Sequence, residues 1–356
     1  MNVSDVSRDY GNSTGIQVAT KGAIGITAKI DDNNATVVGN TIIIPSLDVG
    51  TYVLTVTTIP DSNHLAATKT AKIIVNKINT QLAADPITLI YNTGGDLTVT
   101  LKDVRGNPLA NQQLFVYFNG AKTFDLTDLN GTIKVPVIGL APNTYGVEIV
   151  FKGNDIYNES NVIATVTVNK DSTSLSADAI TAVYNVNKNL VITLKDSRGN
   201  PIDGAAVTVD LNGAKTYTTD SKGQIKVATA NMVPKVYTAK ITFNGDANYD
   251  GSSKDVKVTV KKATPKLTAK KVTLKAKTKT KKYAVILKDN VGKAMNKVQI
   301  TLKVKGKTYK ATTNAKGKAT FKIKKLTKKG TYKAIVTFKG NGNYNKITKT
   351  VKIKVK

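Results

Sequence analysis

The side chains that could perform catalysis or bind a metal are few in this chain. The 356 residues include 24 Asp and Glu, a single His and no Cys. The absence of cysteine excludes disulfides, thiolate metal sites and cysteine nucleophiles. Histidine metal clusters and Ser-His-Asp triads need placed imidazoles, and His64 alone is a poor basis for either.

Three aspartates, Asp103, Asp196 and Asp289, recur in the same phrase, "LKD". An acid/base enzyme needs two carboxyl groups in different environments at one site. An aspartate that returns at the same place in each repeat is better explained as a turn residue, because its carboxylate bonds neighbouring backbone N–H groups. We therefore expect no catalytic residue and no enzyme activity.

A second recurring phrase offers oxygen ligands for calcium. It reads "GNDIYN" and "GDANYD", and its last copy, "GNGNYN", has lost the acids. Calcium prefers six to eight oxygens, often from a fixed carboxylate framework. Because the phrase persists without acids, we expect a structural turn, no metal site and no cofactor. The oxygen-bearing residues are Asn154, Asp155, Asp246, Asn248 and Asp250.

A Lys–Asn isopeptide crosslink is a further alternative at the strand-like endings that close the repeats. Asn76 and Asn169 each precede a lysine there, whereas the third copy has Lys261 in their place.

These phrases repeat because the chain itself repeats. The leucines of "LKD", Leu101, Leu194 and Leu287, are 93 residues apart, and the tyrosines of the second phrase follow nearly the same period. Extended backward, the period places His64 where the later copies have tyrosine. The sequence predicts four domains: 1–77 (truncated or divergent), 78–170, 171–262 and 263–356.

Within each repeat the apolar residues alternate with polar ones. Endings such as "ATVTV", "VKVTV" and "VKIKV" have the period of two that is typical of half-buried strands. Turn signals such as Asn119-Gly120 and Asn212-Gly213 separate them. We predict an all-β chain of tandem Ig-like Greek-key sandwiches. No Gly/Ser-rich linker separates the repeats, so we expect an elongated rod.

A tyrosine opens one strand of each repeat, directly after a corner containing Gly or Pro. This placement is typical of the tyrosine corner of Greek-key sandwiches, in which the hydroxyl bonds a nearby backbone carbonyl. The residues concerned are Tyr52, Tyr145, Tyr237 and Tyr332.

Taken together, "LKDxxGNP", the closing phrase "FNGDANYDGSS" and the lysine-rich composition resemble a known family. They are similar to bacterial-type Ig-like domains of group 3, in the tandem arrays of adhesin-like surface proteins of methanogenic archaea. The resemblance covers three repeats and most of a fourth, and it departs at His64 and in the last repeat. It implies an exported protein at the cell surface or cell wall.

The net charge of +29 is concentrated in one repeat. Residues 263–356 contain 29 Lys, no Arg and one acid, Asp289, whereas the first 262 residues carry 24 basic and 23 acidic groups. Self-repulsion at this density destabilises a domain that has only about 5–14 kcal/mol of stability. We therefore assign the lysines a function.

Lysine alternates with apolar residues in "KVTLKAKTKTKKY", "TFKIKK" and "VKIKVK". We expect this alternation to place the lysines on the outward faces of strands. The candidate anion-binding residues are Lys275, Lys277, Lys279, Lys322, Lys324, Lys352, Lys354 and Lys356.

The use of Lys in place of Arg argues against stereospecific recognition of phosphates or bases, so we expect no specific nucleic-acid partner. The aromatic residues of the repeat, Tyr283, Tyr309 and Phe321, are expected in the core. We predict a noncovalent attachment to an anionic cell-wall polymer or polysaccharide, with the other repeats as a stalk. The alternative is that the Ig-like domains bind a glycan or protein of a host or partner cell.

No run of about 18 apolar residues occurs, so we predict no transmembrane segment. The first 15 residues lack the basic end and apolar core of a signal peptide. If the protein is exported, we expect the signal to precede this sequence.

Overall fold

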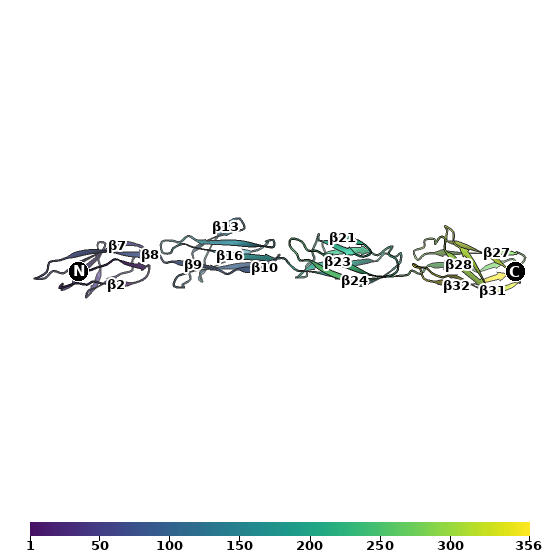
Figure 1. Ribbon diagram of the computed structural model, residues 1–356, viewed down its shortest axis with the longest axis horizontal. Coiled ribbons are helices and arrows are strands. Elements are labelled where there is room, and N and C mark those ends of the chain that lie inside the picture. Colours follow the sequence, from purple (N-terminus) through teal and green to yellow (C-terminus); the bar gives the residue numbers. More distant parts are fainter. The chain divides into compact units, whose positions relative to one another are not determined.

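The computed structural model describes residues 1–356, and all of its regular structure is β-strand (Figure 1). The chain divides into two compact units, 1–170 and 171–356. Each unit holds two of the sequence repeats, which we call repeat 1 (1–77), repeat 2 (78–170), repeat 3 (171–262) and repeat 4 (263–356). The division into four domains at these boundaries stays a proposal.

Repeat 2 shows the strand arrangement most fully. One sheet has the order β14-β11-β9 and the other the order β10-β16-β15-β12-β13. The first strand is divided between the sheets, because β9 pairs antiparallel with β11 while β10 runs parallel to the last strand. The strands are β9 (Thr80–Ala84), β10 (Ile87–Ile90), β11 (Gly95–Asp103), β12 (Gln113–Phe118), β13 (Ala121–Leu126), β14 (Thr132–Val137), β15 (Asn143–Phe151) and β16 (Ser160–Asn169).

Repeats 3 and 4 have the same topology. Their three-stranded sheets are β17-β19-β22 and β25-β27-β30, and their five-stranded sheets are β18-β24-β23-β20-β21 and β26-β32-β31-β28-β29. In repeat 3 the strands are β17 (Thr173–Ala177), β18 (Ile180–Val183), β19 (Asn189–Asp196), β20 (Ala206–Asp210), β21 (Ala214–Thr218), β22 (Gln224–Ala228), β23 (Val236–Phe243) and β24 (Ser252–Lys261). In repeat 4 they are β25 (Lys266–Thr268), β26 (Val272–Leu274), β27 (Thr280–Lys288), β28 (Gln299–Val304), β29 (Lys307–Thr312), β30 (Lys318–Lys324), β31 (Gly330–Phe338) and β32 (Ile347–Val355).

Repeat 1 keeps the five-stranded sheet, β1-β8-β7-β3-β4, with β1 parallel to β8. Its other sheet is β2-β6-β5, and its first residues contribute only an isolated bridge between Asn2 and Ala19. The divergent start of the sequence therefore corresponds to a shortened first strand. The strands are β1 (Val6–Asp9), β2 (Thr14–Gln17), β3 (Ile26–Ile30), β4 (Asn33–Asn34), β5 (Thr36–Val38), β6 (Thr41–Ile44), β7 (Gly50–Thr58) and β8 (Thr68–Asn76).

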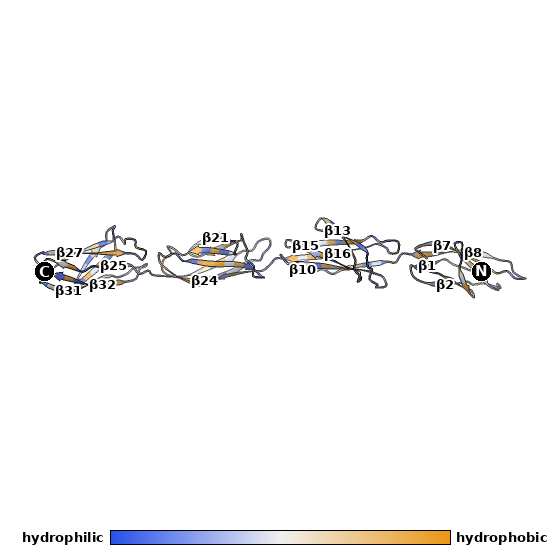
Figure 2. Ribbon diagram, turned by 180° about the vertical axis from the view of Figure 1, so that it is seen from behind, coloured by the Kyte–Doolittle hydropathy of each residue, from blue (hydrophilic) through white to orange (hydrophobic).

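Alternating burial along the strands builds one hydrophobic core per repeat. In β32, Val351, Ile353 and Val355 are buried while the residues between them are exposed. The alternation is visible as mixed hydrophilic and hydrophobic segments along the strands in Figure 2. Four separate clusters of buried side chains result, each drawn from a single repeat. Because burial of apolar area is the main stabilising contribution, each sandwich is held chiefly by its own cluster.

The predicted tyrosine corners are confirmed in all four repeats. Each hydroxyl donates to the backbone carbonyl four residues earlier, over 2.8–3.0 Å. Together with the strand order, these bonds identify Ig-like Greek-key sandwiches, as the sequence predicted. The pairs are Tyr52–Asp48, Tyr145–Ala141, Tyr237–Val233 and Tyr332–Lys328.

Candidate functional site

The recurring acids lie in turns, as the sequence predicted. Asp103 Oδ1 accepts hydrogen bonds from the backbone N–H groups of Arg105 and Asn107, and its Oδ2 accepts one from the Asn107 side chain, all at 2.9 Å. Burial alone would raise the pKa of Asp103, but the bonds from Asn107 and Arg105 hold that pKa below its ordinary value. The carboxylate is therefore engaged in closing a loop.

The phrase "GNDIYN" and its copies form the same Asx turn four times. In repeat 2, Asn154 Oδ1 accepts from the backbone N–H groups of Ile156 and Tyr157, both at 2.9 Å. Asp246 and Asn341 take this role in repeats 3 and 4, and Asp61 does so in repeat 1. The equivalence of amide and carboxylate supports the structural interpretation of this phrase.

His64 belongs to the Asx turn of repeat 1. Its Nδ1 lies 3.0 Å from Asp61 Oδ1, and its side chain is 52% exposed. The pKa of Asp61 is lowered, first by the backbone bond from Asn63 and then by the bond with the His64 side chain. Nowhere do three His, Asp or Glu side chains gather closely enough to hold a metal ion.

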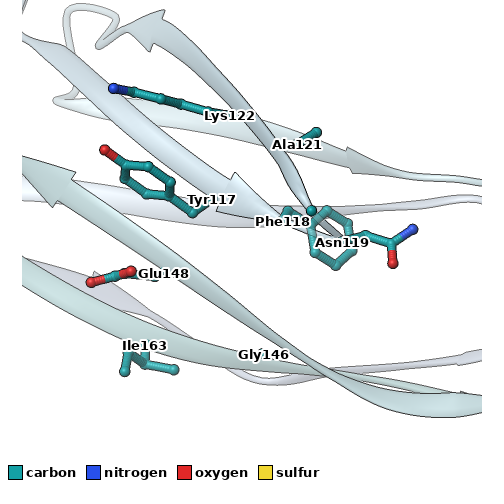
Figure 3. Close-up of a pocket in the computed structure, with 9 residues that line it drawn as sticks. Tyr117, Phe118, Asn119, Ala121, Lys122, Gly146, Glu148 and Ile163 are labelled. Carbon is teal, nitrogen blue, oxygen red and sulfur yellow. The ribbon is translucent and has the colours of Figure 1, made fainter.

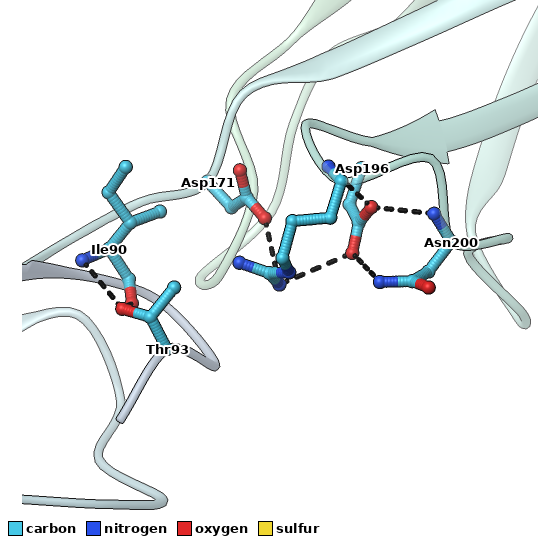
Figure 4. Close-up of polar contacts among 6 residues, drawn as sticks. Ile90, Thr93, Asp171, Asp196 and Asn200 are labelled. Carbon is cyan, nitrogen blue, oxygen red and sulfur yellow. Dashed lines mark hydrogen bonds and ion pairs between the residues drawn. The ribbon is translucent and has the colours of Figure 1, made fainter. Parts of the chain in front are cut away.

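Repeat 3 contains a cluster in which one arginine partly compensates the charges of two buried acids. Asp171 is fully buried, and its Oδ2 lies 3.1 Å from Arg198 Nη2, which also lies 3.2 Å from Asp196 Oδ2 (Figure 4). Asn200 Nδ2 donates to Asp196 Oδ2 over 3.0 Å. Buried acids in this repeat therefore meet a cation.

Repeat 4 has no such compensation. Its one acid, Asp289, accepts hydrogen bonds from the backbone N–H groups of Val291 and Lys293, and from the side chain of Asn185 at 3.2 Å. No lysine of residues 263–356 forms an ion pair with a carboxylate. The lysine charges of this repeat are therefore left almost entirely without a compensating acid in the repeat.

The predicted lysines are all exposed, but the structure distributes them over three regions. Lys322 lies on the outer face of the three-stranded sheet, directly opposite Lys282 in the register of β27 and β30. Lys324, opposite Thr280, continues that face. Like charges in direct register repel each other and destabilise the sheet.

Lys352 and Lys354 lie on the outer face of the five-stranded sheet. Lys352 is in register with Lys333, another directly opposed pair of like charges. Together with Lys271 and the hydroxyl-bearing Thr273 and Thr331, the two lysines line a surface hollow of about 480 Å³, which we call the basic hollow. The sequence did not single out Lys271 or Lys333, although Lys271 opens the run "KVTLKAKTKTKKY".

The expectation that Lys275, Lys277 and Lys279 alternate along a strand is wrong. Strand β26 ends at Leu274 and β27 begins at Thr280, so these lysines lie in the connecting loop. The reason is topological, because the chain must cross there from one sheet to the other. Lys356 lies against the same loop, since its backbone bonds Leu274 and Ala276.

Sequence reasoning also missed a buried lysine. Lys281 is only 2% exposed and points inward from β27. Its ammonium group donates to the carbonyls of Ala276 at 3.2 Å and Thr278 at 2.8 Å. Lys281 thus fixes the loop that carries Lys275, Lys277 and Lys279.

The aromatic residues of repeat 4 lie where the sequence placed them. Tyr283 and Phe321 are buried and stacked at 6.5 Å, and burial raises the pKa of Tyr283. Tyr309 is partly buried against the same cluster. None of the three is an exposed platform on which a base could stack.

Comparison with solved structures finds tandem β-proteins at low identity. An adhesin described as Ca²⁺-stabilized, which helps an Antarctic bacterium reach out and bind ice, is 16% identical over 98% of this chain and 96% of its own, with a TM-score of 0.33. Invasin, a bacterial integrin-binding protein, is 16% identical over 78% of this chain and 60% of its own, with a TM-score of 0.39. Immunoglobulin domains 1–5 of Sidekick-1 are 9% identical over 100% of this chain and 79% of their own, with a TM-score of 0.30.

No family model and no curated protein matches the chain. The assignment of an Ig-like fold rests on the strand order and the tyrosine corners. The structure contains no helix with the length and apolar character of a membrane span.

Proposed function

We propose that this chain is a non-enzymatic, adhesin-like protein of the cell surface, in which repeat 4 attaches noncovalently to an anionic cell-wall polymer. Repeats 1 to 3 act as a stalk. The observation that carries the proposal is the set of 29 lysines and one internally bonded acid in residues 263–356, with no lysine in an ion pair.

A bound polyanion would reduce the electrostatic repulsion among the lysines of repeat 4. Lys282 and Lys322 oppose each other on one sheet face, and Lys333 and Lys352 oppose each other on the other. Each such pair is destabilising in water, and an anionic group between two ammonium groups turns that repulsion into attraction. Both faces of the repeat carry this positive charge. An extended polymer could contact both faces at once, whereas a small compact ligand could not.

The basic hollow is the position at which several lysines could surround one anionic group of the polymer. Lys271, Lys352 and Lys354 surround it, and Thr273 and Thr331 add hydroxyl donors. Lysine ammonium groups are mobile point charges, so they accept carboxylate, sulfate or phosphate without a fixed orientation. Recognition of this kind is weakly specific and sensitive to salt.

The experiment is sedimentation of the full chain with purified cell walls of the source organism, and binding to poly-glutamate beads. The variant Lys271→Gln/Lys352→Gln/Lys354→Gln empties the basic hollow of charge. The matched control, Lys226→Gln/Lys254→Gln/Lys257→Gln, removes the same charge from exposed positions of repeat 3. We expect the wild-type chain to bind at low salt. The affinity should fall at least tenfold in the first triple variant and stay within about twofold of the wild-type value in the control.

At 0.5 M salt, where the screening length is about 4 Å, binding of the wild-type chain should largely disappear. Failure to pellet with walls at low salt contradicts the proposal. So does binding that is insensitive to salt, or equal loss in both triple variants.

A second candidate function is recognition of a host or partner-cell ligand by the near-neutral repeats. It is favoured by one observation, an exposed aromatic face on repeat 2.

A further inference from the structure

The five-stranded sheet of repeat 2 has an outer face unlike that of the other repeats. Tyr117 of β12 is in register with Lys122 of β13 on one side and with Glu148 of β15 on the other. Glu148 is in turn in register with Ile163 of β16, which is 70% exposed. Aromatic, cationic, anionic and aliphatic side chains therefore form one row across four strands.

A second row of the same face adds two phenylalanines. Phe124 is 63% exposed and in register with Phe115, and their ring centroids lie 6.4 Å apart. The Lys122 ammonium lies 5.0 Å from the Phe115 ring centroid and 5.4 Å from that of Tyr117, and the Lys152 ammonium lies 4.8 Å from Phe115. Cations over ring faces hold these side chains in place without covering Phe124.

A hollow of about 450 Å³ opens beside these rows, and we call it the aromatic hollow. Gly146 forms part of its lining, and a Cβ at that position would meet nothing within 4 Å. Figure 3 shows Lys122, Tyr117, Glu148 and Ile163 following one another across the strands, with Gly146 further along the strand that carries Glu148. A side chain at residue 146 would therefore have open space to occupy at the hollow, whose size is within the range of small-molecule sites.

The other full repeats do not reproduce this surface. At the register positions of Phe115, Tyr117 and Phe124, repeat 3 has Thr208, Asp210 and Thr216. After the corner tyrosine, repeat 3 has Thr238 in place of Gly146. The fold therefore does not require the aromatic residues or the glycine, and contiguous exposed apolar groups commonly mark a binding surface.

We propose that the aromatic hollow of repeat 2 binds a neutral carbohydrate. A sugar ring has C–H groups on its apolar face and hydroxyls at its rim. The electron-rich face of Tyr117 attracts polarised C–H groups. Glu148 accepts hydrogen bonds from hydroxyls, and Lys122 and Asn119 donate to them. This inference rests on the second candidate function and is independent of polymer attachment by repeat 4.

The size of the site favours a sugar over a protein. Nine residues line the hollow, whereas a standard protein interface takes about 20 to 30 residues from each side. The ligand class follows from a small hollow with an aromatic wall and a mixed polar rim.

The test is binding of the full chain to an array of neutral glycans at 0.5 M NaCl. The salt suppresses nonspecific electrostatic adsorption through repeat 4, since it reduces the screening length to about 4 Å. Gly146→Thr fills the hollow with the residue that repeat 3 has after its corner tyrosine, and Tyr117→Ser removes the aromatic wall. The matched control is Asp210→Ser, at the register position of Tyr117 in repeat 3.

We expect the wild-type chain to bind at least one class of neutral glycan, with affinity reduced at least tenfold in both repeat 2 variants. Asp210→Ser should bind as the wild type does. Gly146→Thr should melt no earlier than the wild type, because threonine is favoured over glycine in strands. Loss of binding in Gly146→Thr therefore cannot be attributed to unfolding.

Absence of binding to every neutral glycan overturns the proposal. Binding that persists in Gly146→Thr and Tyr117→Ser, or that is lost equally in Asp210→Ser, also overturns it. Wall sedimentation at low salt is measured separately, so the two proposals can fail independently.

Discussion

The five-stranded sheets of repeats 2 and 4 have equivalent cores and opposite surfaces. Facing inward, Val116 and Ile149 of repeat 2 correspond to Leu302 and Val336 of repeat 4, and all four are buried. Facing outward, the register positions of Tyr117 and Phe124 in repeat 2 are held in repeat 4 by lysines, namely Lys303 and Lys310.

This difference shows which residues the fold constrains. A strand residue that points inward must fit into a packed cluster. The next residue along the strand points to solvent, and its identity is constrained only by solubility and by its cross-strand partners. The turns and the corner tyrosines belong to the constrained set, since they recur in all four repeats. Function in this chain is therefore expected on outward positions, where two repeats of one fold have diverged most.

The largest expected effect tests the shared framework. In Gly153→Ala and Gly340→Ala a Cβ would lie 2.6 Å from the Tyr157 carbonyl oxygen and 2.8 Å from that of Tyr344, at φ angles of +72° and +84°. Both backbones would be strained, so we expect each variant to lose about 2–4 kcal/mol of unfolding free energy in its own repeat. Hydrogen exchange read by mass spectrometry resolves the repeats.

The control for both is Gly120→Ala, where a Cβ meets nothing within 4 Å although φ is +78°. Gly120→Ala therefore measures the cost of the positive φ alone, without the steric clash between the added Cβ and a carbonyl oxygen. Equal losses in Gly120→Ala and Gly153→Ala would show that the collision has no effect.

A smaller effect separates repeat 4 from the others. Lys281→Met should lower the stability of repeat 4 by about 2 kcal/mol, because the carbonyls of Ala276 and Thr278 lose a charged donor. Exchange of the loop at 275–279 should accelerate. Lys282→Met, its exposed neighbour, removes a like-charge pair with Lys322 and should leave stability unchanged or raised. The reverse order would contradict the role of Lys281 in fixing the loop.

The corner tyrosines should behave alike in both repeats. Tyr145→Phe and Tyr332→Phe each delete one hydrogen bond, to Ala141 and Lys328 respectively, and each should cost about 1 kcal/mol. Chemical denaturation with exchange readout measures both. A loss confined to one repeat would show that the corner is not a common element.

The smallest effect is acid sensitivity in repeats 2 and 3. The pKa values of Asp103 and Asp196 lie below the ordinary value, since hydrogen bonds from Asn107 and Asn200 outweigh the opposing effect of burial. A carboxyl group whose pKa is lower in the folded state than in the unfolded state stabilises the fold at pH values above the unfolded-state pKa. This contribution is lost as the pH falls through the folded-state pKa. Stability of these repeats should therefore decline below about pH 4.

Asp103→Asn should reduce that decline in repeat 2 while leaving repeat 3 unchanged. A thermal melt series between pH 2 and pH 6 distinguishes the two repeats when combined with exchange. An identical acid profile in the variant and the wild type would rule out the contribution of Asp103.

Sequence reasoning reached the fold because local rules dominate there. Period-two alternation, Asn-Gly turns and the spacing before Tyr145 depend on neighbours in the chain. It placed Lys275, Lys277 and Lys279 on a strand because lysine still alternates with other residues beyond Leu274, although strand β26 ends at that residue. It did not single out Lys281 at all, since no pattern in the sequence reveals that the ammonium group of Lys281 meets two carbonyls.

The aromatic hollow was missed for a different reason. The run "LFVYF" shows alternating aromatics, but their meaning depends on cross-strand register with Phe124 and Glu148, and on the missing side chain at Gly146. Register between β12 and β15 joins residues about 30 positions apart. Such pairings come from the three-dimensional structure, although the contrast of Tyr117 with Asp210 in the repeat alignment was a usable signal.

The parallel pairing of the first and last strands has a mechanical consequence. In repeat 2, β10 lies alongside β16 with Ile87 to Ile90 facing Val166 to Asn169. Tension applied through the two chain ends of the repeat therefore loads these hydrogen bonds together in shear and cannot break them one after another. Pulling the two ends of the repeat apart would therefore have to rupture this short parallel ladder as a unit.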